Sequence, residues 1–168
     1  MIATLTTQRL TLRAPTMADF PVHADIFMSD RARYMDGPVA ENRTWNQFAC
    51  DVAGWVVQGF GYWTVTDRTS DEVLGFTGTA HPPCYPEREI GWMVTQTAEG
   101  KGIAFEAARA VLNHTLGPDC PTLVSYVDPP NIRSIALAER LGATLDPTAA
   151  APSPGDLVYR HLDDGGQS

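Results

Sequence analysis

The stretch TAEGKGIAFEAARAVLNHTL, residues 97–116, joins two glycines and a lysine to the start of an amphipathic pattern. From Ala104 onward its apolar residues recur every three or four positions, which predicts a helix with one face against a core. Gly100 and Gly102 fall in the first turn of this prediction, where each glycine costs about 1 kcal/mol relative to alanine. We therefore expect a ligand to approach this backbone closely.

The chemistry that this stretch could perform is anion binding. The first four amides of a helix lack intrahelical partners and lie at the positive end of the helix dipole, so they can hold a phosphate. The glycines leave those amides unobstructed, and Lys101 adds a cation. Spacing excludes a P-loop, and Phe105 stands where a GxGxxG fingerprint needs its third glycine. The alternative is a flexible turn packed closely on a neighbouring strand.

The segments around this helix predict a mixed α/β domain. Alternating apolar residues predict strands at 10–12, in a hairpin over 61–80 that bends at 67–71, at 88–95, at 121–127, and once or twice in 143–162. Helical spacing predicts further helices from Thr16 and Asp19 to about Met28, from Thr44 to near Gly59, and over 132–142. Such an order implies a sheet covered by helices.

Composition narrows the class of protein. The 168 residues fit one domain with a buried core, and we expect it to span 1–162 with a disordered tail at 163–168. The net charge of −8 argues against a nucleic-acid partner and mildly favours a cationic substrate. The chain lacks a bilayer-spanning apolar run and a secretory signal pattern, so we expect a cytoplasmic protein without a membrane partner. Its scattered cysteines and histidines predict no disulfide framework and no metal site.

Three segments in order resemble the GNAT superfamily of N-acetyltransferases. EIGWMVTQTAEGKGIAFEAARAVLNHTL resembles the acetyl-CoA-binding segment, in which a strand leads into a Q/R-x-x-G-x-G/A loop; Glu99, Gly102 and Ala104 hold its defining positions. TQRLTLRAPTMADF and NIRSIALAERLGA are similar to the opening and the later signature of the RimJ/RimL-like branch, which acetylates N-termini of ribosomal proteins. Together the segments cover most of residues 7–143.

The resemblance implies a single GNAT-like α/β (α+β) domain with acetyl-CoA as cofactor. Its mixed, mostly antiparallel central sheet would be flanked by helices, and its fourth and fifth strands would splay apart to admit the pantetheine arm. Backbone groups of one set would contact the arm, namely Met93, Val94 and Thr95. Amides of a second set would wrap the pyrophosphate, namely Gly100, Lys101, Gly102, Ile103 and Ala104.

Asn131 matches a residue that faces the coenzyme in this family, and its position also favours capping of the helix that follows. Arg109 and Arg133 could reach the 3′-phosphate, or they could lie in solvent. Glu99 replaces the usual glutamine or arginine, so it would place a carboxylate near phosphates, cap the helix or point to solvent.

The implied reaction is direct transfer of an acetyl group to a primary amine in a ternary complex. An alkyl amine with a pKa of about 10 is mostly protonated at neutral pH, so a base is useful. Glu89 matches the glutamate of the family's E-x-G motif and is the candidate base, with Glu87 as the reserve. The alternatives for Glu89 are a solvated carboxylate at the edge of the sheet and an ion pair with Arg88 or another arginine. A strand amide near Met93 could stabilise the oxyanion.

Protonation of the departing thiolate has a weaker candidate. Many GNAT enzymes place a tyrosine seven residues after the position of Asn131, where this chain has Ala138. Ser134 is the candidate substitute, acting through water; alternatively it is a helix-surface hydroxyl, and the thiolate leaves unaided.

The acceptor is expected to be a small-molecule or peptide amine. It would enter near Tyr34, Met35 and Asp36, and the acidic residues before the pocket favour a cation, namely Asp25, Asp30, Asp36 and Glu41. A homodimer is compatible with the sequence. The alternative function is a non-catalytic acyl-CoA-binding or regulatory module.

Overall fold

The computed structural model describes residues 2–162, in which eight strands form one sheet in the order β1-β2-β3-β4-β5-β6-β8-β7. The strands are β1 (Leu5–Thr6), β2 (Leu10–Arg13), β3 (Tyr62–Asp67), β4 (Val73–Ala80), β5 (Glu89–Val94), β6 (Thr122–Val127), β7 (Thr144–Leu145) and β8 (Leu157–Leu162). All neighbours are antiparallel except β5 and β6, which are parallel. The expected tail at 163–168 lies outside the described residues.

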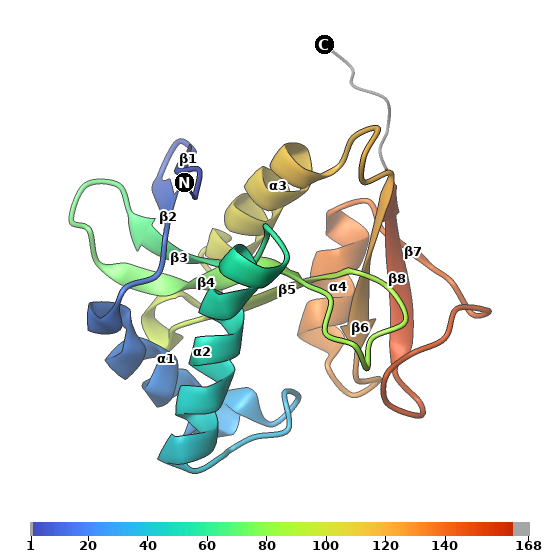
Figure 1. Ribbon diagram of the computed structural model, residues 1–168, viewed down its shortest axis with the longest axis horizontal. Coiled ribbons are helices and arrows are strands. Elements are labelled where there is room, and N and C mark those ends of the chain that lie inside the picture. The colour runs from blue at the N-terminus through green and yellow to red at the C-terminus, as the bar shows by residue number, and fades with distance from the viewer. Residues whose placement is uncertain (1, 163–168) are drawn as a thin grey trace.

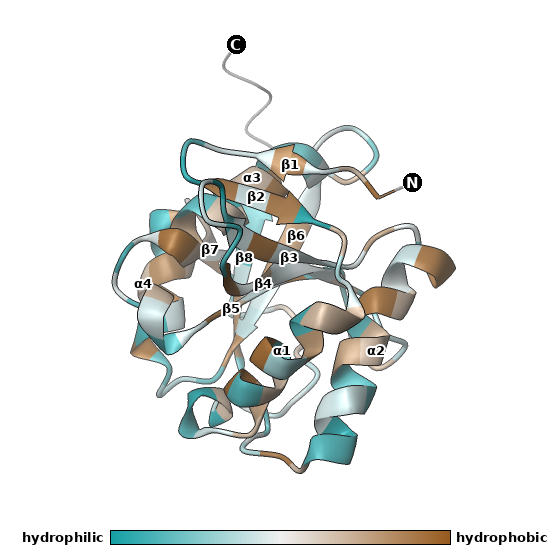
Figure 2. Ribbon diagram, turned by 90° about the vertical axis from the view of Figure 1, so that its left-hand side faces the viewer, coloured by the Kyte–Doolittle hydropathy of each residue, from teal (hydrophilic) through white to brown (hydrophobic). Residues whose placement is uncertain are grey.

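Within residues 2–162, four α-helices and three short 3-10 helices cover the sheet. They are η1 (Met17–Asp19), α1 (Phe20–Phe27), η2 (Asp30–Ala32), α2 (Glu41–Val57), η3 (Gln96–Ala98), α3 (Ile103–Thr115) and α4 (Ile132–Arg140). Figure 2 shows the strands between α1 and α2 on one side and α4 on the other. No helix within residues 2–162 is long and apolar enough to cross a membrane.

Strand alternation divides the apolar side chains between two cores. Leu74 and Ile90 belong to the core under α3, whereas Phe76 and Met93 belong to the core under α1 and α2. In β5 the alternation of side chains places Ile90 and Met93 on opposite faces. In β4 a bulge at Leu74, where the register with β3 shifts, turns Leu74 and Phe76 to opposite faces although they are two residues apart. Both faces of β4 and β5 are therefore covered. Glu89 and Gly91 consequently share the face of Met93, toward α1 and α2.

The predicted helices and strands are present, with shifted ends. The capping pair Thr16 and Asp19 forms, but it caps the short turn η1 ahead of α1. The second helix begins at Glu41 rather than at Thr44, because the Thr44 hydroxyl donates back to the Ala40 carbonyl at 3.2 Å inside the first turn. The two-residue strand β1 was not predicted, since two residues carry no period, whereas β7 and β8 are the two strands expected within 143–162.

The sheet is nearly divided between β5 and β6. Their ladder holds one pair, Glu89 opposite Val124. The Val124 amide donates to the Arg88 carbonyl at 3.1 Å, and the Ser125 hydroxyl donates to the Ile90 carbonyl at 3.1 Å. Beyond Ile90 the strands separate, and in Figure 1 β6 and β8 run steeply across the direction of β3 and β4. The expected splay of the fourth and fifth strands is thus confirmed, although β1 makes them the fifth and sixth.

Candidate active site

The glycine turn before α3 is set by backbone conformation. Gly100 and Gly102 have φ angles of 74° and 75°, and α3 begins only at Ile103 with Gly102 as its N-cap. The expectation that both glycines lie inside the first helical turn is therefore wrong, because left-handed residues cannot continue a right-handed helix. A Cβ at Gly100 would meet no atom within 4 Å, which also removes close packing on a strand as its reason.

The first amides of α3 have no capping side chain. By helix geometry, the amides of Ile103 and Ala104 lack intrahelical acceptors. The Lys101 amide, by contrast, donates to the Ala98 carbonyl at 3.4 Å within the turn. A ligand at this helix end would thus meet the amides that follow Gly102.

Glu99 connects the turn to two other elements. Its carboxylate accepts a hydrogen bond of 2.6 Å from Arg31 of η2 and pairs with Arg133 of α4. Arg31 also donates from Nε to the Val94 carbonyl at 3.1 Å, at the end of β5. Of the three expectations for Glu99, capping and free exposure are wrong. Its negative charge is compensated by two guanidinium groups beside the turn.

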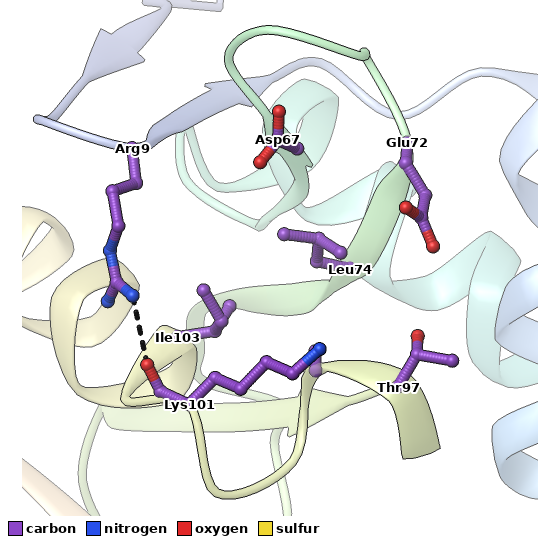
Figure 3. A pocket seen from close by; sticks show the side chains of 8 residues that line it. Arg9, Asp67, Glu72, Leu74, Thr97, Lys101 and Ile103 are labelled. Atoms are coloured by element: carbon purple, nitrogen blue, oxygen red, sulfur yellow. Dashed lines mark hydrogen bonds between the residues drawn. The ribbon is translucent and has the colours of Figure 1, made fainter.

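The Lys101 side chain lines a cavity of about 230 Å³. Figure 3 shows it lying across this cavity toward Thr97, while the Arg9 guanidinium binds the Lys101 carbonyl. The cavity lies between the turn and the β3–β4 hairpin, and its lining is Arg9, Asp67, Glu72, Leu74, Thr97, Ala98, Lys101 and Ile103. A wider groove of about 760 Å³ follows α3 from Lys101 past Phe105 to Asn113.

Glu89 lies where β5 and β6 begin to separate. Burial raises its pKa to about 8, with smaller contributions from the charges of Asp51 and Asp156. The residue keeps some contact with solvent, and within residues 2–162 its carboxylate makes no hydrogen bond or ion pair. A carboxyl group with this pKa can exchange a proton near neutral pH.

The structure contradicts the ion-pair alternative for Glu89 and weakens Glu87 as the reserve base. Arg88 donates to the Thr79 hydroxyl at 2.7 Å and stacks on Phe60 with 3.5 Å to the ring centroid, so it does not pair with Glu89. Glu87 forms a two-bond ion pair with Arg160, at 2.7 and 2.8 Å, which lowers the pKa of Glu87. Glu87 is therefore poorly suited to act as the reserve base.

Three residues that the sequence analysis missed surround Glu89. Asp51 is buried in α2, where burial raises its pKa and where His23 lies 3.3 Å from its carboxylate. Tyr62 and Tyr85 have raised pKa values, mainly through burial and next through the charge of Glu89. The one signal in the sequence is Gly91, since a glycine within a strand often marks a close approach by another group.

Ser134 and Asn131 lie at the start of α4. The Asn131 carbonyl oxygen accepts from the Ser134 amide at 3.2 Å, which confirms the capping interpretation of Asn131. The Ser134 hydroxyl accepts from the Trp92 indole at 3.3 Å and thus contacts β5 across the separation. Ala138 is fully buried and belongs to a core cluster with Tyr159, so a tyrosine has no room at its position.

The remaining expected residues are dispersed. Met93 pairs with Phe76 in the β4–β5 ladder, whereas the Val94 carbonyl points away from β4 toward Arg31. Met35 packs on the core under α1 and α2. Burial raises the pKa of Asp156, and the charges of Asp128 and then Asp36 raise it further. Asp36 therefore lies within electrostatic range of the acidic residues near Glu89.

Comparisons with known proteins agree with this geometry. Residues 9–144 match the family described as Acetyltransferase (GNAT) domain. The crystal structure of the acetyltransferase from Agrobacterium tumefaciens str. C58 is 43% identical with a TM-score of 0.93, over 97% of this chain and 96% of that one.

Two further proteins are more distant. RimL, a ribosomal L7/L12 alpha-N-protein acetyltransferase solved in complex with coenzyme A, is 18% identical with a TM-score of 0.76, over 98% of this chain and 100% of that one. That likeness is one of fold. The uncharacterized protein YkkB of Bacillus subtilis (strain 168) is 32% identical over 87 residues. The match spans 50% of this chain and about half the length of YkkB, 51%.

Proposed function

Because the chain belongs to the GNAT family of acetyltransferases, we propose that it transfers the acetyl group of acetyl-CoA to a primary amine, on a protein N-terminus or a small molecule. The observation that carries the proposal is Glu89: a carboxyl group with a pKa of about 8, free of partners in the described residues, where β5 and β6 separate. The segments at 7–20 and 131–143 and the fold of RimL favour the RimJ/RimL-like branch.

Acetyl-CoA fits the residues around the separation. RimL, which shares the fold, was solved with coenzyme A. Because Arg88 and Ile90 direct their carbonyls to β6, strand alternation directs the main-chain groups of Trp92 and Val94 to the same side. We therefore assign the contacts with the pantetheine arm to Trp92 and Val94, and move the oxyanion amide from Met93 to Trp92. The Thr95 amide is left out of this set, because it donates to the Leu74 carbonyl of β4 at 2.9 Å.

The pyrophosphate is assigned to the turn before α3. Gly100 and Gly102 give the loop its shape, and the amides of Ile103 and Ala104 donate to the phosphate oxygens. Arg133 and Arg31 supply the positive charge, because the Lys101 side chain lies over the cavity of Figure 3. A phosphate would compete with Glu99 for these guanidinium groups.

The mechanism is direct attack with Glu89 as base. Glu89 takes one proton from the acceptor ammonium, and the amine nitrogen attacks the thioester carbonyl carbon. The carbon–sulfur bond then breaks, and the second proton of the nitrogen passes to the departing thiolate. A carboxylate with a pKa of about 8 is a stronger base than an ordinary glutamate, which brings it nearer to the pKa of an alkyl amine. Ser134 accepts from Trp92, so its own hydroxyl proton remains available to the thiolate through water.

The acceptor is a cation. Three acidic residues lie near Glu89. The charges of Asp51 and Asp156 raise the pKa of Glu89, and the charge of Asp36 raises that of Asp156. They belong to the loop before α2, to α2 itself and to the loop before β8, so three separate segments supply the negative charge. A substrate with a second positive charge beyond the reacting amine matches this arrangement.

The test combines binding and turnover. Thermal shift with acetyl-CoA, CoA, ATP and NAD should show stabilisation by the two coenzyme A ligands only, and thiol release should follow addition of amines from a panel. Gly102→Asp should abolish the shift, while Gly102→Asn, which also tolerates the left-handed conformation, should keep most of it. Binding of acetyl-CoA without thiol release for any peptide or small amine would instead identify a binding or regulatory module.

A further inference from the structure

Tyr62 crosses the sheet over two glycines. It stands opposite Gly78 in the β3–β4 ladder, and Gly78 stands opposite Gly91 in the β4–β5 ladder. A Cβ at Gly91 would collide with the Tyr62 hydroxyl. The tyrosine ring therefore extends from β3 past β4, and its hydroxyl reaches β5 directly above the Cα of Gly91.

The hydroxyl arrives on the face that holds the proposed base. Glu89 and Gly91 are two residues apart in β5, so their side-chain directions coincide and their Cα atoms lie roughly 6.6 Å apart. Ser134, the other candidate hydroxyl, contacts Trp92, whose side chain lies on the face of β5 opposite to that of Glu89 and Gly91. Tyr62 and Glu89 thus flank the same position on β5.

The side chain is fixed while its hydroxyl stays free. The Trp55 indole of α2 donates to the Tyr62 carbonyl at 2.9 Å, and the ring packs against the core under α1 and α2. Within residues 2–162 the Tyr62 hydroxyl makes no hydrogen bond, and it remains accessible to solvent, since the buried unpaired side-chain atoms of these residues are the Nδ1 atoms of His23 and His161. A rigid ring with an unpaired donor is arranged for a partner that arrives with the substrates.

We propose that Tyr62 is a catalytic residue whose hydroxyl donates a hydrogen bond to the acetyl carbonyl oxygen as negative charge develops on it. This assignment rests on the proposed acetyl transfer. When the amine attacks, the carbonyl electron pair moves to oxygen, where Tyr62 and the Trp92 amide both donate. When the carbon–sulfur bond breaks, the carbonyl re-forms; Glu89 holds the first amine proton, the thiolate takes the second, and the phenol keeps its own.

A donor role suits Tyr62 better than an acid role. Burial, and next the charge of Glu89, hold the pKa of Tyr62 well above its usual value, so the phenol stays protonated. A thiol has a pKa of about 8.5, so proton transfer from such a phenol to a thiolate is unfavourable. Tyr62 therefore stabilises the developing oxyanion, which is a different role from the thiolate protonation that the resemblance implies for a tyrosine at the position of Ala138.

The experiment is steady-state thiol release by Tyr62→Phe, with Tyr126→Phe as the matched control. Loss of one oxyanion donor lowers kcat by about 10²–10³-fold, and the KM values and the Kd of acetyl-CoA should change less than about threefold. Tyr126 uses its hydroxyl to accept from the Glu87 amide, outside the proposed reaction, so its variant should keep kcat within about twofold.

A second variant separates the hydroxyl from the ring. Gly91→Ala displaces the Tyr62 hydroxyl and should also lower kcat, but it should add little in the Tyr62→Phe background. The kcat of Tyr62→Phe should be lower by the same factor at every pH, and the rise of kcat near pH 8 should remain. A wild-type kcat in Tyr62→Phe, or a loss confined to a shifted pH profile, would overturn the role of Tyr62 alone. Wild-type protein that releases no thiol with any amine would overturn the proposed function as well.

Discussion

Arg31 donates a hydrogen bond of 2.6 Å to Glu99 and so joins η2 to the turn before α3. Arg133 contacts the other carboxylate oxygen from α4. The carboxylate that stands where the family has glutamine or arginine therefore holds two cations at the proposed phosphate site.

Glu99→Gln should tighten coenzyme A binding. The change frees Arg31 and Arg133 for phosphate oxygens and removes one negative charge, which should lower the Kd of CoA by about 3–10-fold at low ionic strength. Calorimetry at two salt concentrations measures this, since screening should reduce the gain. Glu139→Gln on α4 is the control, because Glu139 contacts Tyr159 instead. Weaker binding by Glu99→Gln would contradict the expectation.

Glu89→Gln should remove one limb of the pH–rate profile. Wild-type kcat/KM should rise through about pH 8 as Glu89 loses its proton, on top of the rise from neutralisation of the amine. Glu89→Gln should have a lower kcat/KM, and its pH dependence should follow only the ionisation of the amine. Glu87→Gln, which breaks only the ion pair with Arg160, should retain the limb near pH 8. A limb that persists in Glu89→Gln would assign the base elsewhere.

His161→Gln should flatten the acid side of the stability profile. The His161 Nε2 lies 3.0 Å from the Ser125 hydroxyl, and burial followed by the charge of Arg109 lowers its pKa to about 4. As the pH is lowered from about 6.5 to 4, the unfolded chain gains a proton that the folded chain does not. The free energy of unfolding therefore decreases as the pH is lowered. The melting temperature of the wild-type protein should decrease more than that of His161→Gln as the pH is lowered through this window. A constant difference would contradict the shift.

Asp156→Asn should weaken binding of doubly charged acceptors. Removing one acidic residue near Glu89 should raise the KM of a diamine by about 3–10-fold and that of a monoamine of equal length by less than about twofold. Asp119→Asn, in the loop before β6, serves as the control. Equal effects on both acceptors would remove the argument for a second charge.

Ala138→Tyr should destabilise the protein without restoring activity to a Tyr62→Phe variant. Ala138 is fully buried against a cluster that includes Val127, Ala143 and Tyr159, and overpacking a core typically costs about 1–3 kcal/mol. Thermal unfolding should show a melting temperature lower by several degrees. An unchanged melting temperature with regained turnover would show that α4 can still accommodate the tyrosine.

Local pattern was enough to predict the main helices and strands, and the family motifs were enough to place Glu89 and the glycine turn. The surroundings of Glu89 could not be predicted from the sequence, because Asp51 comes near it only through the packing of α2, and Tyr62 only by reaching from β3 across β4. The partners of Glu99 were hidden for the same reason, since Arg31 and Arg133 lie far from it in the chain. The glycines were correctly singled out, yet their left-handed conformation places them ahead of the helix.

The single parallel pair between Glu89 and Val124 has a mechanical consequence. Few main-chain bonds hold the two parts of the sheet together there, so β6, β8 and α4 can pivot against β2 to β5 while every antiparallel ladder stays intact. This line of few main-chain bonds coincides with the place where the coenzyme is proposed to enter. Occupancy should appear as slower amide exchange along β5 and β6, with an unchanged circular dichroism spectrum.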